Sequence, residues 1–145
     1  MYKKILVPVD GSVQAAKAAL HAAEMGSKLD SEVTLFHVVP SLPPYVNNSP
    51  DLFGNIQQAV IEEFHRHGQE ILEKTMEDLA GYSLDVKTVI TMGNPADEIL
   101  KKIKQDGYDL LVMGNRGLGE IKGYLMGSVS NRVTRHAACP VLIVR

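Results

Sequence analysis

The chain has 145 residues, 45% of them hydrophobic and 22% charged, and a formal net charge of −2 at pH 7. This length and composition are typical of one globular domain, so we expect a single domain over residues 1–145. The near-balanced charge gives no electrostatic reason to expect nucleic acid or an anionic membrane as partner, and no apolar run approaches the ~20 residues of a membrane span. One cysteine, Cys139, excludes an intrachain disulfide. Because Met1 leads almost directly into an apolar run, without a signal-peptide pattern, we expect a cytoplasmic protein.

Two apolar runs in the first third of the chain predict buried strands. Residues 3–9 (KKILVPV) are apolar after two lysines, without alternation, and residues 32–39 (EVTLFHVV) are mostly apolar and β-branched. Such runs are typical of parallel strands covered on both faces. Pro8 lacks an N–H, so it is expected at the carboxyl end of the first strand.

An alanine-rich helix is predicted between these strands, over residues 13–28. Ser12 is its expected N-cap, following the turn residues Asp10 and Gly11. Ala16, Leu20 and Ala23 share one face at helical spacing, and this face is expected to pack on the sheet.

A proline-rich connection and a long helix follow the second strand. Residues 40–50 contain four of the seven prolines, which predicts neither helix nor central strand there. The helix is predicted over residues 55–80 and is amphipathic. Its expected buried stripe contains Val60, Phe64, Ile71, Met76 and Leu79.

The third strand, residues 84–91, alternates apolar and polar side chains, so it is expected at an edge of the sheet. A helix begins after it, with Asn94 as N-cap and Pro95 at its first position, and Gly107 ends it. Its buried side is expected to include Ile99, Leu100 and Ile103.

The last elements are a strand at 109–113, a helix at 128–136 and an apolar strand at 140–144. Five strands alternating with four helices predict an α/β fold with one open, doubly wound parallel sheet, which is Rossmann-like. Right-handed crossovers and an edge-type third strand favour the strand order 3-2-1-4-5. A ligand is then expected where the order reverses, at the carboxyl ends of the first and fourth strands.

A glycine-rich stretch follows the fourth strand at this point. Gly114 and Gly117 begin a loop, and Gly127 and Ser128 stand where the next helix starts. Backbone N–H groups of such a loop and helix start are well placed to bind an anion. The stretch matches neither the P-loop pattern G-x-x-x-x-G-K-[ST] nor the dinucleotide pattern G-x-G-x-x-G.

The spacing Gly114-x2-Gly117-x9-Gly127-Ser128 resembles the G-x2-G-x9-G-[ST] motif of the ATP-binding branch of the universal stress protein family. Three further blocks, KKILVPVDGS, LFHVV and CPVLIVR, extend the resemblance over the whole chain. It implies ATP binding in a stress response, with Mg²⁺ or Mn²⁺ carried by the nucleotide. It also implies a homodimer that pairs through the C-terminal strand, residues 140–145, whose apolar edge invites pairing.

The resemblance implies a role for residues on each side of the crevice. Pro8, Val9 and Asp10 match the segment against the adenosine, Val38 the position whose backbone meets the adenine edge, and Met113 and Gly114 the strand end beside ribose and phosphates. Arg116 and Gly117 match the loop around the phosphates, and Gly127, Ser128, Val129 and Ser130 the helix start beside the phosphate chain.

The residues themselves suggest how these groups could act. Gly114 and Gly117 are expected to allow close backbone approach and a positive φ, and the hydroxyls of Ser128 and Ser130 to donate to phosphate. Asp10 could hold ribose hydroxyls or a nucleotide-bound Mg²⁺; the plainer alternative is a turn aspartate that binds its own backbone.

Three functions remain open. The first is a module that senses or stores ATP, because no set of nucleophile, base and orienting group is visible. The second is a slow or partner-dependent ATP hydrolase. The third is a similar crevice that binds another ligand, such as a flavin.

Overall fold

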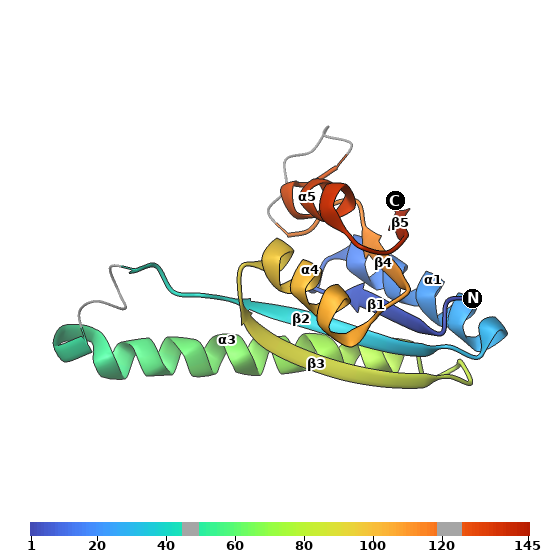
Figure 1. Ribbon diagram of the computed structural model, residues 1–145. Coiled ribbons are helices and arrows are strands. Elements are labelled where there is room, and N and C mark those ends of the chain that lie inside the picture. The colour runs from blue at the N-terminus through green and yellow to red at the C-terminus, as the bar shows by residue number, and fades with distance from the viewer. Residues whose placement is uncertain (45–49, 119–125) are drawn as a thin grey trace.

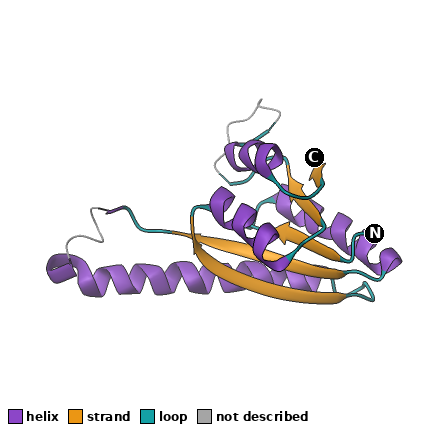
Figure 2. Ribbon diagram, viewed as in Figure 1, coloured by secondary structure: helices purple, strands orange, loops and turns teal. Residues whose placement is uncertain are grey.

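The computed structural model describes residues 1–44, 50–118 and 126–145. Five parallel strands form one sheet in the order β3-β2-β1-β4-β5, which confirms the predicted fold class and topology (Figures 1 and 2). The strands are β1 (Lys4–Pro8), β2 (Glu32–Pro40), β3 (Asp85–Gly93), β4 (Leu110–Gly114) and β5 (Val141–Val144). The helices in the described ranges are α1 (Val13–Leu29), α3 (Pro50–Asp78), α4 (Pro95–Asp106) and α5 (Ser128–His136).

The sheet is covered on both faces, and this explains why its central strands read as continuous apolar runs. In β1, Ile5 and Val7 belong to the core that packs under α1 and α3. Leu6, between them, belongs to the core under α4 and α5. All three side chains are completely buried, so neither face of the strand can carry a polar residue.

The face of helix α1 that packs on the sheet agrees only in part with the expected one: Ala23 is buried as predicted, but Leu20 is not. Leu20 is 39% exposed, whereas the buried residues are small. They allow close approach: a Cβ on Gly26 would lie 2.7 Å from Leu84 Cδ1 and 3.0 Å from Val33 Cγ2. In an alanine-rich helix several stripes are equally apolar, so the contact with the sheet, and not the hydrophobic pattern, selects the stripe of smallest residues. This stripe contains Ala15, Ala18, Ala19, Ala22, Ala23 and Gly26.

Helix α3 is longer than the sheet it covers, and its N-terminal half projects beyond the strands (Figure 1). Of the predicted stripe, Ile71 and Leu79 are buried, but Phe64 and Met76 are 39% and 37% exposed. A helix of 29 residues extends over roughly 43 Å, whereas a strand of 9 residues extends over roughly 30 Å. The expected stripe is wrong in part, because Phe64, at the middle of the helix, and Met76 are not buried.

The predicted helix ends beside the sheet are confirmed. The side chain of Ser12 accepts a hydrogen bond from Ala15 N at 3.1 Å and caps α1. Asn94 Oδ1 accepts from Asp97 N at 3.2 Å and caps α4, and Gly107 ends α4 with a left-handed φ of 67°.

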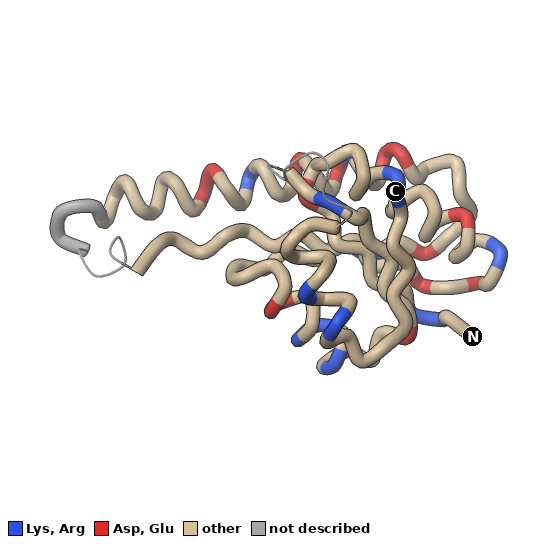
Figure 3. The backbone as a smooth tube through the Cα atoms, turned by 90° about the horizontal axis from the view of Figure 1, so that it is seen from above, with Lys and Arg blue, Asp and Glu red and all other residues tan. Residues whose placement is uncertain are grey.

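Positively and negatively charged residues are interspersed over the described part of the chain (Figure 3). None of the helices described has the combination of length and apolar character that a membrane crossing requires. The central part of the proline-rich connection, residues 45–49, and residues 119–125 of the glycine-rich stretch lie outside the described residues.

Candidate functional site

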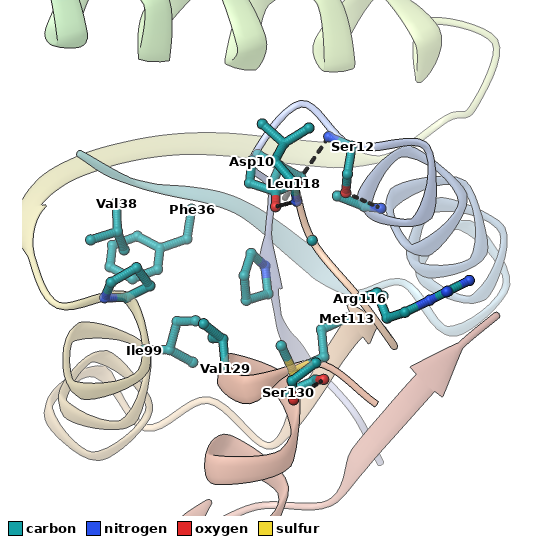
Figure 4. A pocket seen from close by; sticks show the side chains of 17 residues that line it. Asp10, Ser12, Phe36, Val38, Ile99, Met113, Arg116, Leu118, Val129 and Ser130 are labelled. Atoms are coloured by element: carbon teal, nitrogen blue, oxygen red, sulfur yellow. Dashed lines mark hydrogen bonds between the residues drawn. The ribbon is translucent and has the colours of Figure 1, made fainter. Parts of the chain in front are cut away.

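A cavity of about 230 Å³ opens at the carboxyl ends of β1 and β4, where the strand order reverses (Figure 4). This is the location predicted from the topology. Residues from β1, β2, β4 and the starts of α1, α4 and α5 surround it. Its lining consists of Pro8, Val9, Asp10, Ser12, Ala15, Phe36, Val38, Pro95, Ile99, Met113, Gly114, Arg116, Gly117, Leu118, Gly127, Val129 and Ser130.

Eleven of the twelve predicted site residues lie in this lining. The twelfth, Ser128, is the first residue of α5 and is exposed outside it. The two glycine-bearing ends of the stretch, Gly114–Gly117 and Gly127–Ser130, therefore face one cavity, although part of the chain between them lies outside the described residues.

The glycines of the loop are required by packing, and neither Gly114 nor Gly117 has the positive φ that was expected. A Cβ on Gly114 would lie 2.8 Å from Gln14 Cβ and 2.9 Å from the Gln14 carbonyl carbon, in the first turn of α1. A Cβ on Gly117 would lie 2.4 Å from Asp10 Oδ2. Each glycine allows a neighbouring segment to come close. Glycine is therefore required at these two positions by close packing and not by its conformational freedom.

Asp10 joins the end of β1 to the glycine loop. Its Oδ1 accepts from Ser12 N at 2.9 Å, which is the turn hydrogen bond of the plainer alternative. Its Oδ2 accepts from Leu118 N at 3.0 Å, across 108 positions of sequence. The carboxylate therefore has both a local and a tertiary role, and it holds two walls of the cavity together.

One backbone carbonyl group links the start of α5 to the end of β4. Asn115 O accepts from Gly127 N at 2.7 Å and from Ser130 Oγ at 2.7 Å, so the start of α5 is fastened to the residue after β4. Ser130 Oγ is also 3.1 Å from Gly127 O. Its single hydroxyl proton is engaged with these carbonyls, so in this arrangement Ser130 does not offer the O–H that was expected for phosphate.

The start of α5 differs from the starts of α1 and α4. Those two helices are capped by side chains, whereas Gly127, the N-cap of α5, makes no side-chain hydrogen bond to the first turn. The first turn of a helix has N–H groups without intrahelical partners, and it carries the positive end of the helix dipole. Val129 and Ser130, which belong to this turn, line the cavity. This wall is consequently suited to an anion.

The opposite end of the cavity is apolar. Figure 4 shows the side chains of Phe36, Val38, Ile99 and Val129 gathered there, away from Asp10 and Leu118. Such a surface suits the flat face of an aromatic ring system. Sequence reasoning found Val38 and Val129 but missed Phe36 and Ile99. Phe36 was detectable, because it lies two residues before Val38 and therefore on the same face of β2.

The remaining unpredicted lining residues are Ser12, Ala15, Pro95 and Leu118. Ser12 and Leu118 are adjacent to predicted site residues in the sequence. Pro95 comes from the start of α4, and its presence depends on which face of the sheet that helix covers.

Two ionisable side chains stand among the described lining residues, Asp10 and Arg116. The side chain of Arg116 extends away from the other lining groups, toward α1 (Figure 4). Its Nε is buried and has no hydrogen-bond partner among the described residues. No group of three or more His, Cys, Asp or Glu that could hold a metal ion occurs in the described ranges. Asp10 alone does not make a resident Mg²⁺ site, so any such ion would be held chiefly by a ligand.

Comparisons with known proteins identify the family. The model of the universal stress protein family matches residues 1–145. Universal stress protein YxiE of Bacillus subtilis is 35% identical, with all of both chains covered. Universal stress protein UspA from Lactobacillus plantarum has the same fold, with a TM-score of 0.86, 26% identity, and 99% of this chain and 98% of that chain covered. The Arabidopsis thaliana universal stress protein family protein solved with AMP bound has a TM-score of 0.63 and 25% identity, and 98% of this chain and 90% of that one are covered.

The sheet topology, with a cavity at the strand-order reversal, places the chain in the class of open, doubly wound α/β proteins. Within that class, the chain belongs to the universal stress protein family.

Proposed function

We propose that this protein binds ATP in the cavity between β1 and β4 and acts as a small nucleotide-sensing or regulatory module in a stress response. The observation that carries the proposal is the division of the cavity into an apolar end and an anion-suited end. An adenine ring next to Phe36, Val38 and Ile99 would leave its phosphates toward the start of α5. The Arabidopsis relative with AMP bound supports an adenine nucleotide as the ligand.

The phosphate end of this proposal rests on α5 and the loop before it. The first-turn N–H groups of α5 lack a side-chain cap. A phosphate is a strong acceptor with negative charge, so it suits both the N–H groups at the start of a helix and the positive end of the helix dipole. A divalent cation would arrive with the phosphates, and Asp10, the one carboxylate in the described lining, could contact it or its water shell.

Binding without rapid hydrolysis is the activity that the described lining favours. Hydrolysis needs a group that orients or deprotonates the attacking water. Both carboxylate oxygens of Asp10 already accept backbone hydrogen bonds, and Arg116 is a cation. Slow hydrolysis, or hydrolysis that requires a partner protein, is the alternative function.

Titration calorimetry with ATP and with AMP, in the presence and absence of Mg²⁺, tests the proposal. We expect dissociation constants in the micromolar range for ATP with Mg²⁺, and no more than trace phosphate release. Val129→Asp places a carboxylate in the cavity wall on the first turn of α5, where it would repel the phosphate chain and replace an apolar contact, so it should weaken ATP binding at least tenfold.

Val13→Asp is the matched control, because Val13 is 68% exposed and does not line the cavity. It should bind ATP as the unchanged protein does. Absence of ATP binding at millimolar concentration would contradict the proposed ligand. Absorption above 350 nm in the purified protein would favour a flavin instead.

We also propose a homodimer in which β5 of each copy pairs along the free edge of the sheet. β5 is the last strand in the sheet order and has one paired neighbour, β4. Unpaired N–H and C=O groups along an apolar edge favour association with a second strand. A cytoplasmic location remains part of the proposal.

A further inference from the structure

His37 lies in β2 between two residues of the cavity lining, Phe36 and Val38, but its ring is on the opposite face of the sheet. The side chain is 7% exposed. It packs beneath α3, where a Cβ on Gly68 would lie 2.5 Å from His37 Cδ2 and 3.0 Å from His37 Nε2. The absence of a side chain at Gly68 therefore makes room for the imidazole ring.

The ring makes one hydrogen bond, and the chemistry of the partner determines its tautomer. His37 Nδ1 is 2.8 Å from Val9 O. A carbonyl oxygen accepts but cannot donate, so Nδ1 must carry the proton. In the neutral ring, Nε2 then has the lone pair and lies against Gly68.

This hydrogen bond stands where the ladder between β1 and β2 ends. The paired register runs from Lys4↔Glu32 to Pro8↔Phe36. One residue further, Val9 N still donates to Phe36 O at 2.9 Å. The next bond of a parallel ladder would join the N–H of Val38 to the carbonyl of Val9. That carbonyl accepts from the side chain of His37.

We propose that His37 is a positioning residue for the cavity, because its Nδ1–H replaces the N–H of Val38 as donor to the Val9 carbonyl. The replacement ends the pairing of β1 with β2 at the point where the crevice opens. It satisfies the buried carbonyl of Val9 without consuming the N–H of Val38 in the ladder. Since the N–H groups of Phe36 and Val38 both point toward β1, the Val38 N–H is directed to the opening.

This inference deepens the proposed function and rests on it for the identity of the ligand. A ligand that uses the Val38 N–H must present an acceptor in the plane of the sheet, between the apolar side chains of Phe36 and Ile99. A ring nitrogen at the edge of a purine base has this chemistry. His37 would thus act on the base end of the nucleotide, from the far side of the sheet.

Three variants test the assignment by amide hydrogen exchange in the ligand-free protein and by AMP titration. His37→Leu removes the donor while keeping an apolar side chain under α3, so the Val9 carbonyl should recruit the Val38 N–H. We expect exchange at Val38 to slow at least tenfold, and AMP affinity to fall at least tenfold. His37→Asn carries a side-chain N–H near the position of Nδ1, and it should keep both values within about threefold of the unchanged protein. His65→Leu, at an exposed histidine on α3, is the control for removal of an imidazole.

The direction of the exchange effect separates positioning from simple damage. General destabilisation speeds amide exchange, whereas closure of the ladder slows it at Val38. Unchanged exchange at Val38 in His37→Leu, or unchanged AMP affinity, would overturn the role given to His37. If the unchanged protein bound neither ATP nor AMP, the proposed function would fail, and the exchange at Val38 would still decide whether His37 terminates the ladder.

Discussion

At the scale of single residues, the shape of the cavity depends on a close contact that only a glycine allows. Gly117 is in contact with the carboxylate of Asp10, and this carboxylate accepts from the N–H of Leu118. Asp10 is thus both a turn residue and a tertiary link. Its conformation depends on the glycine opposite, so the two positions are expected to be energetically coupled.

A double-mutant cycle at Asp10 and Gly117 tests this coupling. Gly117→Ala puts a methyl group 2.4 Å from Asp10 Oδ2, so it should displace the carboxylate and lower the free energy of unfolding by about 1–2 kcal/mol. In the Asp10→Ala background the obstructing carboxylate is absent, and the same substitution should cost less than about 0.5 kcal/mol. Urea denaturation of the four proteins measures both values. Equal costs in the two backgrounds would show that the contact has no energetic role.

At the scale of elements, α3 combines two different environments in one helix. Its C-terminal half packs on β2 and β3 through Ile71 and Leu72, and Leu79, directly after the helix, belongs to the same core. Its N-terminal half projects past the sheet, as Figures 1 and 3 both show, and there Ile56 is 62% exposed. Gly54 lies in the projecting half and Gly68 in the packed half, so the same residue type has two different functions along one helix.

The two glycines of α3 predict opposite effects of the same substitution. A Cβ on Gly54 would meet no atom within 4 Å, so Gly54→Ala should stabilise the protein by up to about 1 kcal/mol through helix propensity. A Cβ on Gly68 would lie 2.5 Å from the ring of His37 and 2.7 Å from Ile90 Cδ1. Gly68→Ala should therefore destabilise by about 1–3 kcal/mol despite the gain in propensity. Thermal and chemical denaturation provide the measurement; stabilisation by both substitutions would contradict the close packing under Gly68.

At the scale of the whole molecule, the sheet formed by the described residues ends in two edge strands, β3 and β5, with different side chains. The β5 edge carries Leu142, which is 36% exposed, and the β3 edge carries Met92, which is 41% exposed. β3 also presents Asp85 and Lys87 along its length, and charged residues on an edge oppose pairing with another chain. β5 has no charged residue between Val141 and Val144, so the dimer is expected at β5.

Substitution of one exposed apolar residue at each edge distinguishes them. Leu142→Lys introduces two like charges close to the proposed two-fold axis, and it should weaken the dimer at least tenfold. Met92→Lys makes the same change on the β3 edge and should leave association unchanged. Sedimentation velocity across micromolar concentrations measures this. A strict monomer for the unchanged protein, or equal effects of the two variants, would contradict pairing through β5.

The sequence by itself determined the order of elements, the sheet topology and the place of the cavity. Each of these follows from local signals: apolar runs without alternation at 3–9 and 109–113, the cap residues Ser12 and Asn94, and glycines at fixed spacing. Such signals act within a few residues, or through the general rule that crossovers are right-handed, so they can be interpreted without coordinates. The resemblance to the universal stress protein family then implied twelve site residues, of which eleven line the cavity.

The tertiary structure decided what those signals leave equivalent. An alanine-rich helix has several apolar stripes, and its contact with the sheet selected the one that excludes Leu20. The purpose of Gly114 and Gly117 depends on Gln14 and Asp10, which lie about a hundred positions earlier in the chain. Likewise, nothing in the sequence distinguishes His37 from other strand residues. Its role follows from two tertiary contacts of its ring, the hydrogen bond to the carbonyl of Val9 and the packing against the backbone of Gly68. Packing between distant segments is a property of three-dimensional distance, and a linear pattern does not contain it.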